Sequence, residues 1–166
     1  MGNPRVPNSP VIRQATAADF EQVLELVYGW WLENTDSGWP EPTPAGVAEA
    51  LAQTIVNPAQ MFLVADCGSG KLGGMLCGFV QPFFWSPQTL QAVIQLLRCV
   101  GEHEVLNSLV REFHRRVDGR VIEVSFTLSS GYREDVMVRY MRRFGYKRIG
   151  TDLRRQVCVS ASTSDT

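Results

Sequence analysis

Three consecutive segments decide the fold: GRVIEVSFTL at 119–128, SSGYREDVMVRYMRRFGY at 129–146 and KRIGTDLRRQV at 147–157. Apolar and polar residues alternate in the first segment, which predicts a strand. The apolar residues of this strand are expected to share one face, namely Ile122, Val124, Phe126 and Leu128. The second segment has apolar residues at helical spacing, so it predicts an amphipathic helix.

The ends of this helix carry their own signals. Acidic residues open it and arginines close it, which complements the helix dipole. Gly145 can take the left-handed stop position, and Tyr146 then starts a returning strand. The end of the chain is therefore predicted as strand, helix and strand.

Periodicity and turn formers predict the other elements. In chain order they are a strand at Val11–Gln14, a helix capped by Thr16, a helix capped by Thr43 and stopped at Asn57–Pro58, strands at Met61–Cys67, Met75–Trp85 and Ala92–Arg98, and a helix at Glu102–Val117. The segment 86–100 could also be helical, because a proline after Ser86 is a good helix start.

A strand, a helix ending in Phe-Gly-Tyr and a returning strand resemble the end of an acyl-CoA N-acyltransferase of the GNAT superfamily. The order of all elements extends this resemblance over residues 11–157, between a flexible arm (1–10) and a flexible tail (158–166). The resemblance implies an α/β (α+β) fold. Its sheet would be mixed and mostly antiparallel, with a central splayed parallel strand pair and about four flanking helices.

The resemblance also implies a cofactor site. In the family the acyl-CoA thioester enters the gap between the parallel strands, here Ala92–Arg98 and Val121–Leu128, and the pyrophosphate lies on the N-terminus of the helix between them. The cofactor would be acetyl-CoA if the chain is active. The implied cofactor-binding residues are Leu96, Leu97, Arg98, Cys99, Val100 and Gly101.

The cofactor loop departs from the family pattern. The family has two closely spaced glycines after an Arg or Gln, whereas this chain has only Gly101. Glu102 and Glu104 stand where the diphosphate would lie, and each carboxylate would cost on the order of a kcal/mol there. We therefore interpret both as helix-start residues.

The catalytic positions also depart from the pattern. The family's general acid is a Tyr four residues before the helix-ending Gly, and this position is Met141. Tyr140 is adjacent, but one helical residue is a rotation of about 100°. Tyr140 is thus expected to be a core or rim aromatic and is the candidate acid only if the register shifts. Glu123 is a candidate general base if it faces a pocket.

These departures favour a non-catalytic binding or assembly protein that needs no cofactor. The alternative is an active acetyl-CoA-dependent N-acetyltransferase with an atypical phosphate loop. Degenerate proteins of this fold resemble ones found in bacteriophage genomes, some of them virion components. The resemblance thus implies a cytoplasmic protein, or a virion protein if a phage encodes it.

Composition sets further limits. The chain has 166 residues, enough for one domain, and its net charge of −1 gives no overall electrostatic preference. No apolar run reaches the roughly 18 residues of a membrane helix. The four cysteines show no metal-type pairing, and His103 and His114 are expected on the surface, too far apart to share a metal.

Two surfaces are predicted to bind a protein partner or a second copy. One is the loop around Trp39, since core aromatics rarely lie inside a Gly-Pro turn. The other is a basic strip made of Arg139, Arg142, Arg143, Lys147 and Arg148. A solvated helix face explains most of this positive charge, so nucleic acid is the less expected partner.

Overall fold

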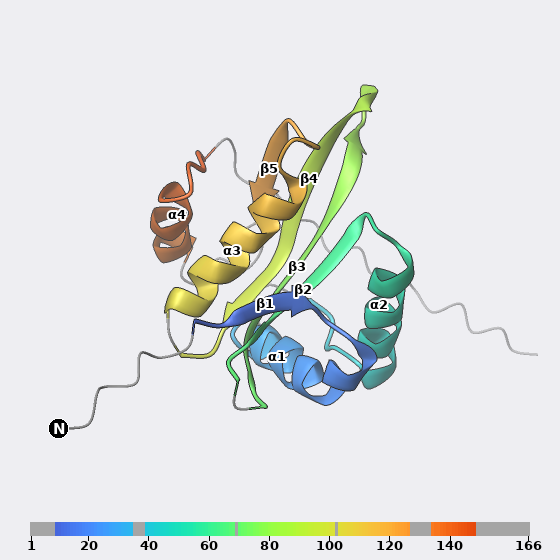
Figure 1. Ribbon diagram of the computed structural model, residues 1–166, viewed down its shortest axis with the longest axis vertical. Helices are drawn as coiled ribbons and strands as arrows, with labels where there is room; N and C mark the ends of the chain where they lie inside the picture. The colour runs from blue at the N-terminus through green and yellow to red at the C-terminus, as the bar shows by residue number, and fades with distance from the viewer. Residues whose placement is uncertain (1–8, 35–38, 69, 102, 127–133, 149–166) are drawn as a thin grey trace, which may run out of the picture.

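The computed structural model describes residues 9–34, 39–68, 70–101, 103–126 and 134–148 (Figure 1). The elements within these ranges are β1 (Val11–Gln14), the 3₁₀ turn η1 (Ala17–Asp19), α1 (Phe20–Leu32), α2 (Pro44–Val56), β2 (Gln60–Asp66), β3 (Leu72–Phe83), β4 (Ser86–Cys99), α3 (His103–Val117), β5 (Glu123–Phe126) and α4 (Glu134–Arg142).

The five strands form one sheet in the order β1-β2-β3-β4-β5. Pairing is antiparallel from β1 to β4, and β4 and β5 are parallel. This is the mixed, mostly antiparallel sheet with one parallel pair that was predicted. The alternative of a helix at 86–100 is wrong, because β4 covers this segment as a continuous strand.

Local signals account for the helix starts. The Thr43 hydroxyl accepts a hydrogen bond from the Gly46 N–H at 3.1 Å, and Pro44 occupies the first helical position of α2. At the start of η1, the Asp19 carboxylate accepts hydrogen bonds from the Thr16 N–H and hydroxyl, both at 2.8 Å. Thr16 therefore precedes the short 3₁₀ turn η1, and α1 begins only at Phe20.

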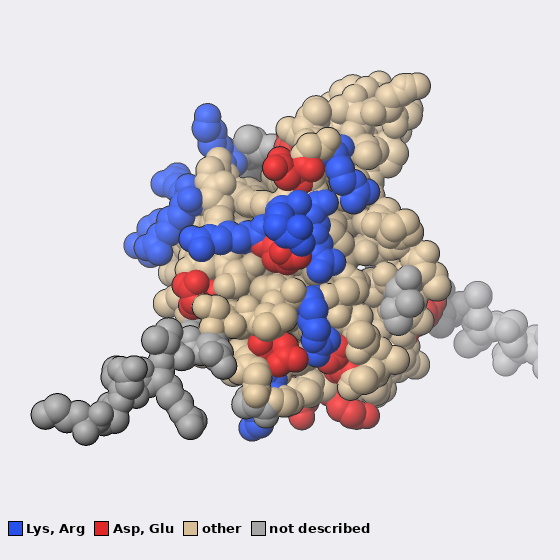
Figure 2. All heavy atoms as spheres, viewed as in Figure 1, with Lys and Arg blue, Asp and Glu red and all other residues tan. Residues whose placement is uncertain are grey.

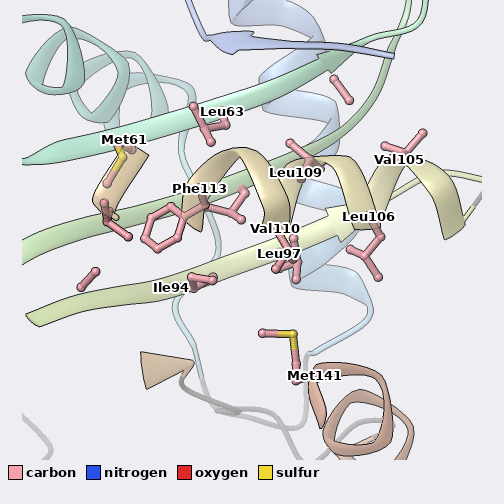
Figure 3. Packing of buried hydrophobic residues seen from close by; sticks show 14 of the residues in the cluster. Met61, Leu63, Ile94, Leu97, Val105, Leu106, Leu109, Val110, Phe113 and Met141 are labelled. Atoms are coloured by element: carbon pink, nitrogen blue, oxygen red, sulfur yellow. The ribbon is translucent and has the colours of Figure 1, made fainter. Parts of the chain in front are cut away.

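Each face of the sheet has its own hydrophobic core. The larger core packs α3 and α4 on one face, with Leu76 of β3 and Leu97 of β4 among its residues (Figure 3). The second packs α1 and α2 on the other face and includes Met75, the neighbour of Leu76. Successive residues of a strand point to opposite faces, so β3 contributes to both cores. The result is three layers, helices–sheet–helices (Figure 1).

A glycine in β3 lets α3 approach the sheet closely. A Cβ built on Gly78 would lie 2.6 Å from a ring carbon of Phe113 and 2.6 Å from the Val93 carbonyl oxygen. Phe113 is fully buried in the larger core. The absence of a side chain at Gly78 therefore makes room for the Phe113 ring. Figure 3 shows this ring pointing from α3 toward the strands.

The strand at 119–128 differs from its prediction at its start. β5 begins at Glu123, and Ile122 is 74 % exposed instead of facing the core. Val124 and Phe126 do pack against the larger core, as predicted. Leu128 lies outside the described residues.

The hairpin between β3 and β4 also has different limits. β3 begins at Leu72 and ends at Phe83, so Trp85 lies in the turn and not in the strand. β4 starts at Ser86, six residues before the predicted start. Both strands are thus longer than the apolar pattern alone indicated.

The end of α4 follows the predicted stop. Gly145 has a φ of 86°, the left-handed conformation, and the Tyr146 N–H donates to the Met141 carbonyl at 3.3 Å. Residues 146–148 form no strand, and 149–157 lie outside the described part of the chain. So do residues 1–8 of the arm and the tail 158–166. No helix in the described ranges is long and apolar enough to cross a membrane.

Candidate functional site

The parallel strands β4 and β5 form the first part of the candidate site. Their pairing runs from Gln91↔Glu123 to Ile94↔Phe126, and β4 continues to Cys99. Beyond Ile94, β4 pairs with β3 along one edge, and no described residue pairs with its other edge. Residues 95–99 of β4 therefore extend past the last described parallel pair, where the resemblance places the acyl thioester.

The turn from β4 into α3 forms the second part. Gly101 has a φ of 98° and a Cβ there would meet nothing within 4 Å, so the turn needs this left-handed conformation and is open around it. The N–H of Val100 donates to the Gly73 carbonyl at 2.8 Å and is not free for a ligand. His103 and Glu104, at the start of α3, are both exposed.

Arg98 points away from this turn. Arg98 is paired with Met75 of the neighbouring strand β3. Paired residues point to the same face of a sheet, so the Arg98 side chain lies on the α1–α2 face with Met75. Its Nη2 and Nε lie 3.1 and 3.3 Å from Glu33 Oε1, just after α1. The guanidinium occupies the space where a Cβ of Gly29 would be. The basic residue of the predicted phosphate loop thus joins β4 to α1.

Cys99 points to the opposite face from Arg98 and packs, partly buried, against the larger core. Burial raises the pKa of its thiol, and the Glu33 carboxylate raises it further. A raised pKa disfavours the reactive thiolate, and the contact of Cys99 with the larger core indicates a packing role.

Tyr140 lies between α4 and α3. Its ring is buried in the larger core and packs against Phe144, with ring centroids 5.4 Å apart. Its hydroxyl donates to Asn107 Oδ1 at 2.8 Å. Burial raises the pKa of Tyr140 to about 12, and the nearby Cys99 contributes to this rise. The neighbouring Met141 is also buried.

The predicted site residues are therefore only partly brought together. Leu97, Cys99 and Tyr140 pack in or against one core. Glu123 is exposed and pairs with Gln91, five strand residues or roughly 16 Å before Leu96. The candidate base is thus remote from the end of β4.

His114 differs from its prediction as a surface residue. It is half-buried, stacks on Tyr146 at a centroid distance of 5.6 Å, and has its Nε2 2.7 Å from the Tyr146 hydroxyl oxygen. Burial lowers the pKa of His114. His103 is exposed, as predicted. Within the described residues, no three His, Cys, Asp or Glu side chains are grouped as metal ligands.

The predicted contact surfaces have different characters. Trp39 is partly exposed, but its ring packs edge-on against Trp30 at 6.2 Å, and Trp31 Nε1 donates to the Trp39 carbonyl at 3.1 Å. The residues of the basic strip are all exposed. Figure 2 shows Lys and Arg side chains gathered over α4 and the neighbouring surface of α3.

Residue-by-residue reasoning missed the most exposed aromatic side chains of the described ranges. These are Phe84 and Trp85, at the turn between β3 and β4, with 94 % and 81 % of their surface exposed. The available signal was an apolar turn, FFW, in place of the usual Gly, Asn or Asp.

No family model matches this chain, and no curated protein matches it either. Solved structures do. A transcriptional regulator from Bacillus halodurans C-125 superposes with a TM-score of 0.73 at 19 % identity, covering 89 % of this chain and 99 % of that one.

Two further matches are aminoglycoside acetyltransferases. One, from an uncultured soil metagenomic sample and in complex with trehalose, has a TM-score of 0.69 at 13 % identity and covers 94 % of this chain and 100 % of its own. The other, AAC(6')-Iy in complex with CoA, has a TM-score of 0.69 at 12 % identity and covers 92 % and 99 %. Together with the sheet order and the parallel pairing of β4 with β5, these matches show that the chain has the fold of the GNAT acetyltransferases.

Proposed function

We propose that this chain uses the GNAT fold as a scaffold for binding or assembly and does not transfer acyl groups. The observation that carries the proposal is the position of Arg98. The one basic residue next to the predicted phosphate loop is bonded to Glu33 on the opposite face of the sheet. The Tyr140 hydroxyl is likewise engaged, by Asn107.

Recruiting these groups to a cofactor would cost free energy. Arg98 would have to leave Glu33, and an ion pair with one half-exposed partner contributes up to about 1 kcal/mol. The exposed Glu104 would stand close to a diphosphate bound at the start of α3 and would oppose it. We therefore expect no cofactor, with weak or absent acyl-CoA binding.

Calorimetric titration with acetyl-CoA tests this proposal. We expect no measurable binding at micromolar concentrations, either for the native chain or for Glu33→Gln, because Arg98 points to the α1–α2 face even without its partner. A dissociation constant below about 100 µM for the native chain, some −5.5 kcal/mol, would contradict the proposal. Circular dichroism of both proteins controls for folding.

An acetyl-CoA-dependent N-acetyltransferase remains the second candidate function. It is favoured by the left-handed Gly101 at the start of α3 and by the edge of β4 beyond Ile94. In that case Tyr140, next to Cys99, is the candidate acid. Tyr140→Phe should then lower turnover by roughly 100-fold or more, whereas Tyr28→Phe on α1 should not. Equal turnover in both variants would remove Tyr140 from the mechanism.

The partner of a scaffold protein follows from its surfaces. We expect a protein partner bound through the Trp39 loop or the basic strip, or a second copy bound through the Trp39 loop, and not a nucleic acid. The expected location is the cytoplasm, or the virion if the gene belongs to a phage. Pull-down of a candidate partner by the native chain but not by Arg142→Glu would support the basic strip.

A further inference from the structure

The hairpin of β3 and β4 extends beyond the rest of the sheet. β2 pairs with β3 only as far as Phe79, and β5 pairs with β4 only from Gln91 onward. The Val80 N–H still donates to the Ala59 carbonyl, and the Leu90 carbonyl accepts from the Ile122 N–H, so the two-stranded ribbon is the segment 81–89, which we call the hairpin tip. Figure 1 shows it projecting past the helices on both sides. A two-stranded ribbon in water is marginally stable by itself, so a covering surface would stabilise it.

The hairpin tip carries no charge. The sequence from Leu72 to Leu97 contains no Asp, Glu, Lys or Arg, although one residue in five of the whole chain is charged. Figure 2 shows the projecting part of the molecule without a single acidic or basic side chain. A surface of this kind is unusual, since charged residues normally keep exposed strands from associating.

Two large aromatic rings stand at the end of the tip. Phe84 and Trp85 are almost fully exposed, and the Trp85 ring lies 5.8 Å from that of Phe83. Phe and Trp side chains bury about 150–250 Å² each when they are covered. Exposed aromatic groups of this size mark interaction surfaces in water-soluble domains.

We propose that the hairpin tip is the contact through which two copies of this chain form a symmetric dimer. In a two-fold interface the same surface meets itself, so it must not repel itself. The hairpin tip satisfies this condition because it is neutral. The basic strip does not satisfy it, and an acidic or basic partner would find no complementary charge on the tip.

The area of the tip is of the right order for such a contact. A stable interface buries about 800 Å² on each partner. Phe84 and Trp85 supply about half of this, and their exposed neighbours on the two strands can supply the remainder. These neighbours are Gln81, Pro82, Pro87 and Gln88.

The prolines of the hairpin tip disfavour a dimer in which the strands of the two copies pair. Each strand of the tip contains one, Pro82 in β3 and Pro87 in β4, and a proline has no N–H to donate to an added strand. The copies therefore pack through the aromatic faces of the tip and not by extending the sheet. This contact does not depend on whether the chain binds acyl-CoA.

Sedimentation velocity between 1 and 100 µM tests the proposal. We expect a concentration-dependent dimer for the native chain and at least a 30-fold weaker one for Phe84→Ser/Trp85→Ser. Both positions are exposed, so the variant should keep its circular dichroism spectrum. The matched control is Val56→Ser, an equally exposed apolar residue (80 %) at the end of α2, which should dimerise like the native chain.

Three results would overturn the proposal. The first is a native chain that stays monomeric at 100 µM. The second is an unchanged dimer in the double variant. The third is a dimer that weakens more than about 3-fold between 0.05 and 0.5 M NaCl, because exposed charges are screened in this range and a neutral contact is not. Co-sedimentation of a monomeric native chain with phosphatidylcholine vesicles would instead assign the tip to a lipid surface.

Discussion

Replacing Asp19 by Asn tests how the first strand is tied to the first helix. Asp19 is 5 % exposed, and its carboxylate accepts from Arg13 Nη1 at 2.7 Å and Nη2 at 2.8 Å. It also accepts from the Thr16 N–H and hydroxyl. In Asp19→Asn the amide N–H₂ must replace one of the two carboxylate oxygens, so a donor then faces the Arg13 guanidinium in either orientation.

The expected loss is large relative to the total stability. Removing one partner from a buried ion pair costs about 3–5 kcal/mol, because the other charge stays behind without compensation. We take the lower end, about 3 kcal/mol, since the Arg13 side chain keeps about a third of its surface in water. For a domain of this size that corresponds to a decrease in Tm of roughly 10 °C.

The loss should depend on pH. Hydrogen bonds from Arg13 hold the pKa of Asp19 well below its usual value, and those from Thr16 add to this effect. The stabilisation is therefore complete above the unfolded pKa, near 3.8, and decreases as the pH falls below it. The difference between native chain and variant should be constant from pH 7 to 5 and should shrink below pH 4.

Urea unfolding followed by circular dichroism measures this difference. Asp135→Asn is the matched control, because it removes a carboxylate that pairs with Arg139 at 3.2 Å on the surface of α4. Exposed pairs of this kind contribute less than about 0.5 kcal/mol. If Asp19→Asn lost less than about 1 kcal/mol, or no more than the control, the ion pair would not be a main link between β1 and α1.

Two further predictions concern the larger core. Gly78→Ala should cost about 1–3 kcal/mol in urea unfolding, because the new methyl group meets the Phe113 ring, and a neutral result would show that α3 can shift. Burial lowers the pKa of His114, so stability should decrease as the pH falls below about 6.5, where the unfolded chain binds the proton first. His114→Gln should flatten this pH dependence between 7 and 5, and an unchanged slope would assign the effect to another group.

The sequence predicted correctly the helix ends that depend on residues close to them in the chain. Thr43 with Pro44 starts α2, Asn57 ends it, and Gly145 terminates the last turn after α4. These residues act within a few positions of themselves, through a capping hydroxyl, a fixed φ or a left-handed backbone. The order of strands and helices followed from such signals together with the apolar periodicity.

The exposure of several side chains depends on contacts between segments far apart in the chain, and the sequence did not predict it. The apolar alternation predicted that Ile122 faces the core, but β5 starts one residue later and leaves it exposed. His114 has the helical position of a surface residue and becomes half-buried because Tyr146 folds back onto it. The exposure of Phe84 and Trp85 was missed for the same reason. It follows from the limits of β2 and β5, whose pairing with β3 and β4 does not reach the turn, and these limits cannot be seen in the sequence.

Arg98 shows the same limit at the candidate site. Leu97 and Cys99 point to the face of α3 and α4, and the pleat of β4 then requires Arg98, between them, to point to the face of α1. A basic residue three positions before Gly101 resembles a phosphate ligand in the sequence. The side chain of a strand residue points to only one face of the sheet, however, and that of Arg98 points away from α3. Because Arg98 neutralises Glu33, its charge is not available at the start of α3, where Glu104 remains. A phosphate bound there would have to rely on backbone N–H groups and the helix dipole against that carboxylate.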